Sequence, residues 1–288
     1  MTYQLFLGDY AYSSWSLRGW FLFEKFDIPR DQIMVDFSAG TVIAQLPNCA
    51  PARTVPTLIT PEGAVVSDSL AIAEELASRN PEAGLWPSSA KARATARSLA
   101  AEMHAGFVAL RSECPMNLRI SYLDASPSQD LLADLARLEA IWAHARATNQ
   151  TTGPWLFGSY SIADAMFAPV AARIAGYNLP VDQHAMDYVN AHLSDPAFRR
   201  WRAMGMVHGA TLPWYAMDHA QRPWPGPAPR KAVALANGTP ENAKCPYSGN
   251  PSTHFMEMEG RIFGMCNAFC RDKTVADPEA WPAFMALV

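Results

Sequence analysis

The sequence has few cysteines, no long apolar run and no excess of basic charge. Its 288 residues include five cysteines, an odd and sparse set that argues against a disulfide framework and indicates a reducing, cytoplasmic compartment. No stretch of about 18 apolar residues occurs, and the first residues lack the basic and apolar segments of a signal peptide, so we expect neither a membrane span nor secretion. The formal net charge of −4 gives no reason to expect nucleic acid or anionic membrane as a partner.

What the sequence does contain is typical of a folded protein of about two domains with an appendage. Hydrophobic residues make up 50% of the chain and charged residues 17%, and a chain of this length can bury enough surface to fold without disulfides. Breaks in the pattern divide it into a domain at 1–80, an all-helical domain at 88–221, a proline-rich linker at 222–240 and a small cysteine-bearing α+β module at 241–288.

The first 80 residues have the order of a thioredoxin-like α/β domain. A strand, a helix and a strand are followed by a hairpin and a second helix. The alternation and capping patterns predict strands at 4–7, 33–37, 57–60 and 64–66, with helices at 13–26 and 69–78.

The region from 88 to about 206 is predicted to be helical throughout. Ser161 to Asp164 forms a capping box, in which Asp164 is expected to serve the helix rather than a substrate. The predicted helices cover 88–112, 128–147, a segment opening at 161, 181–193 and 195–204.

Serines cluster where the first strand gives way to the first helix. Ser13 and Ser14 open that helix, within the stretch Tyr-Ser-Ser-Trp-Ser-Leu-Arg. Free backbone N–H groups and the positive end of the helix dipole stabilise an anion there, and a bound thiolate would have a lowered pKa. Helix capping explains the same serines without any ligand. Both interpretations stay open on this segment alone.

Two further segments offer groups that recognise a peptide. Pro56 stands just before a strand, a position that suits a cis bond and leaves Val55 free to pair with an extended peptide. At the start of the next helix, the amides and the Ser69 hydroxyl can hold a carboxylate, and Asp68 can hold an ammonium group. A thiolate, a peptide backbone and an amino-acid head group are the parts of glutathione.

With these segments in this order, residues 1 to about 210 resemble a cytosolic glutathione S-transferase. The serine stretch is similar to that of serine-type bacterial members and of the zeta class, the maleylacetoacetate isomerases. The resemblance implies glutathione as co-substrate, a homodimer, and a catalytic serine that stabilises the thiolate, either Ser13 or Ser14. Ser13 aligns with the first serine of the zeta motif and is preferred. The implied glutathione-binding residues are Val55, Pro56, Asp68 and Ser69.

Conjugation of the thiolate to a small electrophile is the activity that the resemblance implies. Glutathione-dependent cis–trans isomerisation is the first alternative. Trp15 stands where the zeta motif has cysteine, and Tyr12 stands where it has a basic residue, and both differences weigh against isomerisation. Cys49 is expected to be incidental.

The helical domain is expected to supply the pocket for the second substrate. In that pocket Arg111 could pair with a carboxylate of an acidic substrate. A packed interior face with one satisfied histidine explains the same pattern equally well. The candidate residues recur at helical spacing, and they are Met103, His104, Phe107 and Arg111.

The tail carries a spacing of cysteines that is typical of metal sites. Cys245 is followed after 20 residues by Cys266 and then Cys270, across a predicted hairpin of 253–259 and 261–265. This resembles the treble-clef-like TRASH or YHS modules, in which thiolates converge on one metal.

A closed zinc site needs a fourth ligand, and His254 is the natural candidate because it is the only histidine of the module. Ser248 stands where some relatives have a second cysteine, and serine is a poor ligand. A metal-free remnant whose cysteines only pack is the competing interpretation. The metal-site interpretation gives the second functional alternative: a non-catalytic glutathione-fold module that carries or senses a metal through its tail.

Overall fold

The N-terminal domain is a four-stranded mixed sheet with two helices packed on one face. The computed structural model describes residues 2–149 and 152–288. The strand order is β2-β1-β3-β4, with β1 parallel to β2 and the other pairs antiparallel. The elements are β1 (Tyr3–Leu7), α1 (Ser14–Glu24), β2 (Arg30–Met34), β3 (Thr57–Ile59), β4 (Val65–Ser67) and α2 (Ser69–Arg79). The predicted thioredoxin-like order is confirmed, although β2 begins three residues earlier than expected.

The sheet has a core on each face. Leu5 and Leu7 of β1 point into the large core that α1 and α2 share with the helical domain. Phe6 points the other way, into a smaller cluster with Val35 and Cys49 that the loop between β2 and β3 covers. This alternation is what a strand buried on both faces requires. Cys49 is buried within this second cluster.

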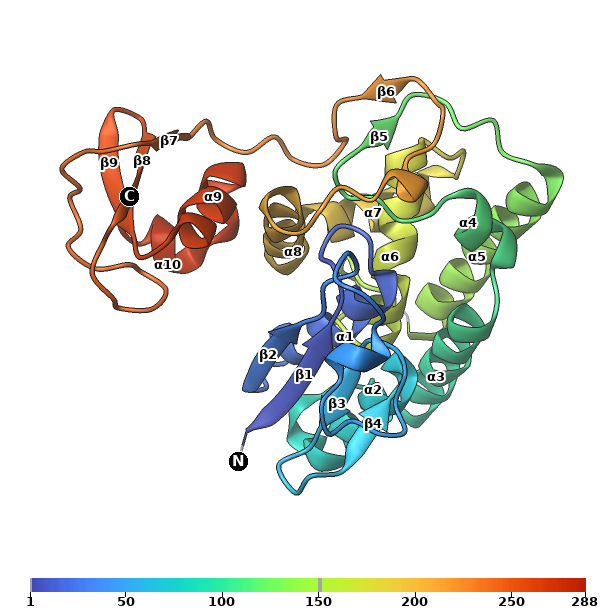
Figure 1. The fold of residues 1–288 in the computed structure, drawn as a ribbon. Coiled ribbons are helices and arrows are strands. Elements are labelled where there is room, and N and C mark those ends of the chain that lie inside the picture. The colour runs from blue at the N-terminus through green and yellow to red at the C-terminus, as the bar shows by residue number, and fades with distance from the viewer. Residues whose placement is uncertain (1, 150–151) are drawn as a thin grey trace.

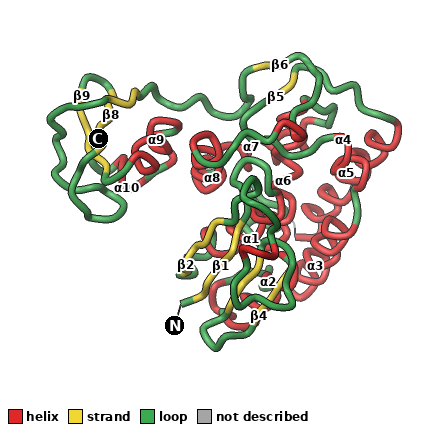
Figure 2. Tube along the Cα trace, viewed as in Figure 1, coloured by secondary structure: helices red, strands yellow, loops and turns green. Residues whose placement is uncertain are grey.

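The described residues of the second domain form helices α3 to α8, which pack beside the first domain (Figures 1 and 2). Helix α6 runs through its centre with every residue buried, because it is apolar on all sides. Asp164 accepts hydrogen bonds from the Ser161 N–H group at 2.9 Å and from the Tyr188 hydroxyl at 2.9 Å, so the predicted capping box is present. The helices are α3 (Ala90–Ala105), α4 (Val108–Glu113), α5 (Gln129–Asn149), α6 (Ile162–Tyr177), α7 (Gln183–Ser194) and α8 (Pro196–Val207).

The expectation of one helix over 88–112 is wrong. Helix α3 ends at Ala105, and Phe107 takes a left-handed conformation with φ of 58° before α4 begins. A Cβ atom at Gly106 would lie 2.9 Å from the Glu102 carbonyl oxygen, so the turn requires glycine there. The break matters because the chain changes direction before α4, the helix that carries Arg111.

The tail is a three-stranded antiparallel sheet with two short helices. Strand β7 (Val233–Leu235) pairs with β8 (His254–Met258), so the sheet reaches back into the segment expected to be linker. Strand β8 pairs with β9 (Arg261–Met265) as the predicted hairpin. Helices α9 (Ala268–Ala276) and α10 (Pro282–Met285) complete it. The remaining short pair, β5 (Ser121–Tyr122) with β6 (Gln221–Arg222), ties the start of the linker to the helical domain.

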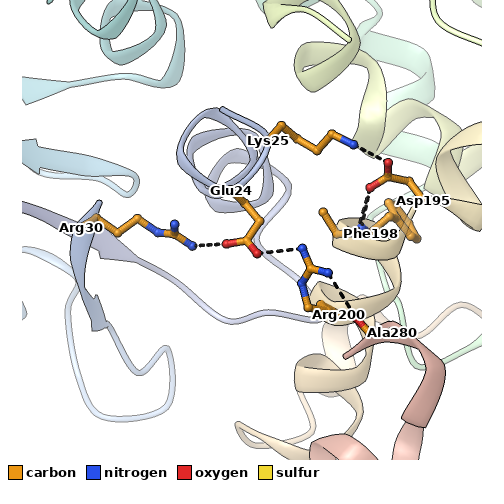
Figure 3. Close-up of polar contacts among 8 residues, drawn as sticks. Glu24, Lys25, Arg30, Asp195, Phe198, Arg200 and Ala280 are labelled. Atoms are coloured by element: carbon orange, nitrogen blue, oxygen red, sulfur yellow. Dashed lines mark hydrogen bonds and ion pairs between the residues drawn. The ribbon is translucent and has the colours of Figure 1, made fainter. Parts of the chain in front are cut away.

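The tail docks on α8, and α9 lies beside that helix (Figure 1). Arg199 donates two hydrogen bonds to Asp277, at 2.6 and 2.8 Å. Its neighbour Arg200 donates to Glu24 of α1 at 2.8 Å and to the Ala280 carbonyl oxygen at 3.1 Å (Figure 3). One side chain thus joins all three parts of the molecule. In the described part of the chain, no helix is long and apolar enough to span a membrane.

Candidate active site

Asp9 shapes the loop that delivers the serines to the start of α1. Its side chain accepts hydrogen bonds from the Ala11 and Tyr12 N–H groups, at 2.7 and 3.2 Å, and its carbonyl oxygen accepts from the Ser13 N–H group at 2.9 Å. Burial raises the pKa of Asp9 above its ordinary value, although these N–H groups and the charge of Arg119 act in the opposite direction. A single Asp after a strand gave no signal of this role in the sequence.

The two candidate serines lie side by side with different partners. Ser13 is the N-cap of α1, and its hydroxyl donates to Ser16 Oγ at 2.8 Å and accepts from the Ser16 N–H group at 3.3 Å. Ser14 Oγ accepts a hydrogen bond from Arg173 at 3.4 Å. Both serines line a cavity of about 540 Å³ between the two domains. Capping and a role in the cavity are therefore compatible.

The predicted glutathione-binding residues line one adjoining cavity of about 310 Å³. Val55, Pro56, Asp68 and Ser69 are all there, and the Val55–Pro56 bond is cis, as predicted. Trp15, Thr54 and Val55 line both cavities, so the two adjoin.

The groups at the start of α2 are placed to hold a charged head group. Ser69 is 1% exposed, and its hydroxyl has no hydrogen-bond partner among the described residues. Asp68 caps α2 with Oδ1, while its Oδ2 lies 3.1 Å from His104 Nε2. A ligand ammonium group at Asp68 would share that carboxylate with His104.

The larger cavity is cationic. Arg53, Arg111 and Arg173 line it, and none of its described lining residues is acidic. Arg173 donates to the Cys114 and Pro169 carbonyl oxygens, and Arg111 to those of His104 and Gly106. None of the three forms an ion pair within the described residues.

Buried guanidinium groups at and near the larger cavity reinforce its cationic character. Trp15 lies between two guanidinium groups, with the Arg18 group 4.5 Å and the Arg111 group 4.8 Å from its ring centre. Burial, with the charges of Arg173 and Arg111, lowers the pKa of Arg18 to about 9. Burial lowers the pKa of Arg173 to about 10. Both groups stay charged at neutral pH, so the cavity favours an anion.

The four helical-domain candidates separate into two pairs. His104 and Arg111 line the cavities, but Met103 and Phe107 are buried in the hydrophobic core. The break at Gly106 puts α3 and α4 on different axes, so the four do not share one face as the spacing predicts. Arg173 was missed. Its signal is a lone cationic residue within the mostly apolar sequence of α6.

The tail brings its three cysteines together. The sulfurs of Cys245, Cys266 and Cys270 lie within 4.8 Å of one another. Among the described residues, no histidine or carboxylate joins this group. His254, expected as the fourth partner, begins β8, and its Nδ1 lies 3.0 Å from the Thr253 hydroxyl instead. Ser248 Oγ lies 3.3 Å from Cys266 Sγ.

Comparison with known proteins bears on the first two domains. Residues 12–79 match the family described as "Glutathione S-transferase, N-terminal domain". A glutathione transferase homologue from Burkholderia gl BGR1, solved with bound glutathione, is 21% identical with a TM-score of 0.52, over 70% of this chain and 96% of its own.

The chain has the glutathione transferase fold. A glutathione transferase from Methylococcus capsulatus is 19% identical with a TM-score of 0.52, over 72% of this chain and 100% of its own. Glutathione transferase Omega 1C from Trametes versicolor is 15% identical with a TM-score of 0.54, over 71% and 93%. No curated protein matches the sequence. These matches leave more than a quarter of the chain outside the shared fold.

Proposed function

We propose that this chain is a glutathione transferase that joins the glutathione sulfur to an electrophile bearing an anionic group. The observation that carries the second half is the cavity beside Ser13 and Ser14, whose only charged described lining groups are three guanidinium groups. The adjoining cavity, with Val55 and the unpartnered Ser69 hydroxyl, accounts for the glutathione half. A buried cation that has no counterion within the protein is best satisfied by an anionic group on the ligand.

The proposed chemistry needs few groups. Ser13 turns its O–H from Ser16 to the glutathione sulfur, because a thiolate is a stronger acceptor than a neutral hydroxyl. The thiol proton leaves to solvent, and the sulfur lone pair forms a bond to the electrophilic carbon. The bonding electron pair displaced at that carbon departs with the leaving group, or moves onto the electron-accepting group of the electrophile. Arg111 and Arg173 hold the anionic group of the electrophile, and Arg173 orients Ser14.

A matched pair of substrates tests the proposed selectivity. We expect the enzyme to favour 4-chloro-3-nitrobenzoate over 4-chloro-3-nitrobenzamide, because both carry the same leaving group but only the first carries a charge. Arg111→Gln should lower kcat/KM for the benzoate by roughly ten- to a hundredfold, the value of one charge-assisted bond, and change the amide little. Arg111→Lys should restore part of the benzoate rate.

The control is Arg93→Gln, which also removes an arginine bonded to carbonyl oxygens, those of Pro87 and Ser88, but away from the cavity. Equal rates on the two substrates would refute the anionic selectivity. Absence of glutathione binding in calorimetry would refute the transferase itself.

The resemblance also predicts a zeta-like subtype and a homodimer in the cytoplasm. These stay predictions. Sedimentation of the purified chain tests the dimer directly, and a rate assay with a cis-configured diketo acid tests the isomerase alternative.

A further inference from the structure

The tail places three cysteine sulfurs at the spacing of a metal site. Cys266 Sγ and Cys270 Sγ are 3.9 Å apart, and all three sulfurs lie within 4.8 Å of one another. Thiolates around a tetrahedral zinc ion, at about 2.3 Å from the metal, lie about 3.8 Å from one another. The chain therefore needs little movement to bring all three into contact with one ion.

Two separate turns build this arrangement. Cys245 sits in a tight turn in which the Gly249 N–H group donates to its carbonyl oxygen at 2.9 Å and Gly249 has φ of 71°. Cys266 directly follows β9, and Asn267 caps α9 by accepting from the Cys270 N–H group at 2.8 Å. The Asn267 cap fixes the first turn of α9, in which Cys270 lies. The sulfur of Cys270 thereby lies near that of Cys245.

Donors surround the sulfurs as they do around bound thiolates. Backbone N–H groups of Tyr247, Ser248 and Cys266 are directed at Cys245 Sγ. The Ser248 hydroxyl and the Asn267 side-chain amide donate to Cys266 Sγ, at 3.3 and 3.4 Å. Such outer bonds fix and stabilise the ligands of a metal centre.

A buried lysine beside the cluster completes the charge balance. Lys273 is 9% exposed, stands over the Trp281 ring at 3.9 Å, and has no carboxylate partner among the described residues. Three thiolates and a divalent cation together carry one net negative charge, which this ammonium group balances. A monovalent ion would leave the pocket with uncompensated negative charge.

We propose that the tail binds one thiophilic divalent cation, with zinc as the probe, through Cys245, Cys266 and Cys270. The fourth position of the tetrahedron is open and lies beside the exposed Ser248, where water or another small ligand completes the coordination. Zinc sites with three protein ligands and one exchangeable position are those that take part in chemistry or exchange, whereas closed sites are structural.

The first experiment counts the metal in the full chain, purified under reducing conditions without chelator. We expect about one zinc per chain. Cys266→Ser should lose it, while Cys49→Ser, which changes a buried cysteine outside the tail, should keep it. Replacing zinc by cobalt should give thiolate-to-metal charge-transfer absorbance in the wild type and not in Cys266→Ser.

The second experiment adds a ligand instead of removing one, so a failure to fold cannot mimic the result. Ser248→Cys should close the site and tighten zinc binding by more than the roughly ten- to a hundredfold that an outer-shell partner contributes. It should also shift the cobalt spectrum toward that of a four-thiolate centre. A wild type without cobalt–thiolate absorbance, zinc retained by Cys266→Ser, or a Cys266–Cys270 disulfide as the only product under these conditions overturns the proposal.

Discussion

The first turns of α1 and α9 differ in where the sulfur comes from. At α1, Ser13 caps the helix and no cysteine is among the described residues lining the adjoining cavity, so a thiolate has to arrive with a ligand. At α9, Asn267 caps the helix, and Cys266 and Cys270 bring sulfur from the chain itself. Free N–H groups and the positive end of the dipole favour negative sulfur at both places. The same local structure thus serves a diffusible thiol in one region and, as we propose, metal-bound thiolates in the other.

The two regions also differ in what stabilises them. The transferase fold has a core that runs from β1 through α1 to the fully buried α6. The tail has a small sheet whose buried residues, among them Met256 and Phe263, join that core, and it also contacts α8 through the Arg199–Asp277 pair. Substitutions at the cavities of the transferase fold should therefore change catalysis. Substitutions at the α8 residues that contact the tail should change the docking of the tail.

The largest effect expected is that of Ser13→Ala on conjugation. Loss of one charge-assisted hydrogen bond of about 1.5–3 kcal/mol should lower kcat/KM by roughly ten- to a hundredfold. The pKa of the bound glutathione thiol, followed by thiolate absorbance against pH, should rise. Ser14→Ala should change that pKa less, and zinc content should stay the same in both variants.

If Ser14→Ala shifts the thiol pKa and Ser13→Ala does not, then Ser14 is the donor. If neither variant moves the pH–rate profile, the serine mechanism is wrong. Ser13→Thr, which keeps a hydroxyl and a capping group, is the control for helix stability.

A smaller effect is expected from Arg199→Ala on the docking of the tail. The change leaves the Asp277 side chain, 10% exposed, without its bidentate partner, which should cost about 1–3 kcal/mol. Hydrogen exchange should then speed up in α9 and at the end of α8, with glutathione binding unchanged.

Arg271→Ala is the matched control, because Arg271 pairs only with its neighbour Asp272 among the described ion pairs. Unchanged exchange in α9 after Arg199→Ala would show that apolar contacts, such as Phe269 against Tyr10, hold the tail instead.

The order of elements could be predicted further than the site. Strand and helix periodicity, turns and caps are local properties, and they predicted the thioredoxin-like domain, the helical domain and the β8–β9 hairpin. The break at Gly106 was missed because an isolated glycine in a helical pattern is tolerated unless the fold needs the turn. Strand β7 was missed because a three-residue strand next to a proline-rich segment has no periodicity of its own.

The cationic cavity shows why the rest could not be predicted. Arg111 and Arg173 are 62 positions apart, and only the packing of α4 against the centre of the domain brings both to the cavity at Ser14. For the tail, spacing predicted that the cysteines converge, but it could not place His254. The Nδ1 atom of that residue lies beside the Thr253 hydroxyl, and the direction of a single side chain at the start of a strand cannot be read from the spacing of cysteines.

The smallest effect expected is a pH dependence of the contact between α1, α8 and the tail. Burial would raise the pKa of Glu24, but hydrogen bonds and charge from Arg30 and Arg200 lower it below its ordinary value of 4.5. A carboxyl group whose pKa is lower in the folded state stabilises the fold above its unfolded pKa, and this contribution is lost as the pH falls through the folded value. Arg200 also holds the Ala280 carbonyl oxygen, so protonation of Glu24 should loosen the tail as well.

Thermal unfolding of the wild type and of Glu24→Gln, measured from pH 7 to pH 3, tests this linkage. We expect the wild type to be the more stable at pH 7. The difference should shrink as the pH falls from 4.5 through the lower pKa of the folded Glu24, because the glutamate then becomes neutral like the glutamine. Glu82→Gln, at an exposed carboxylate outside this contact, should show no such trend. A constant difference at every pH would mean that Glu24 acts through packing and not through its charge.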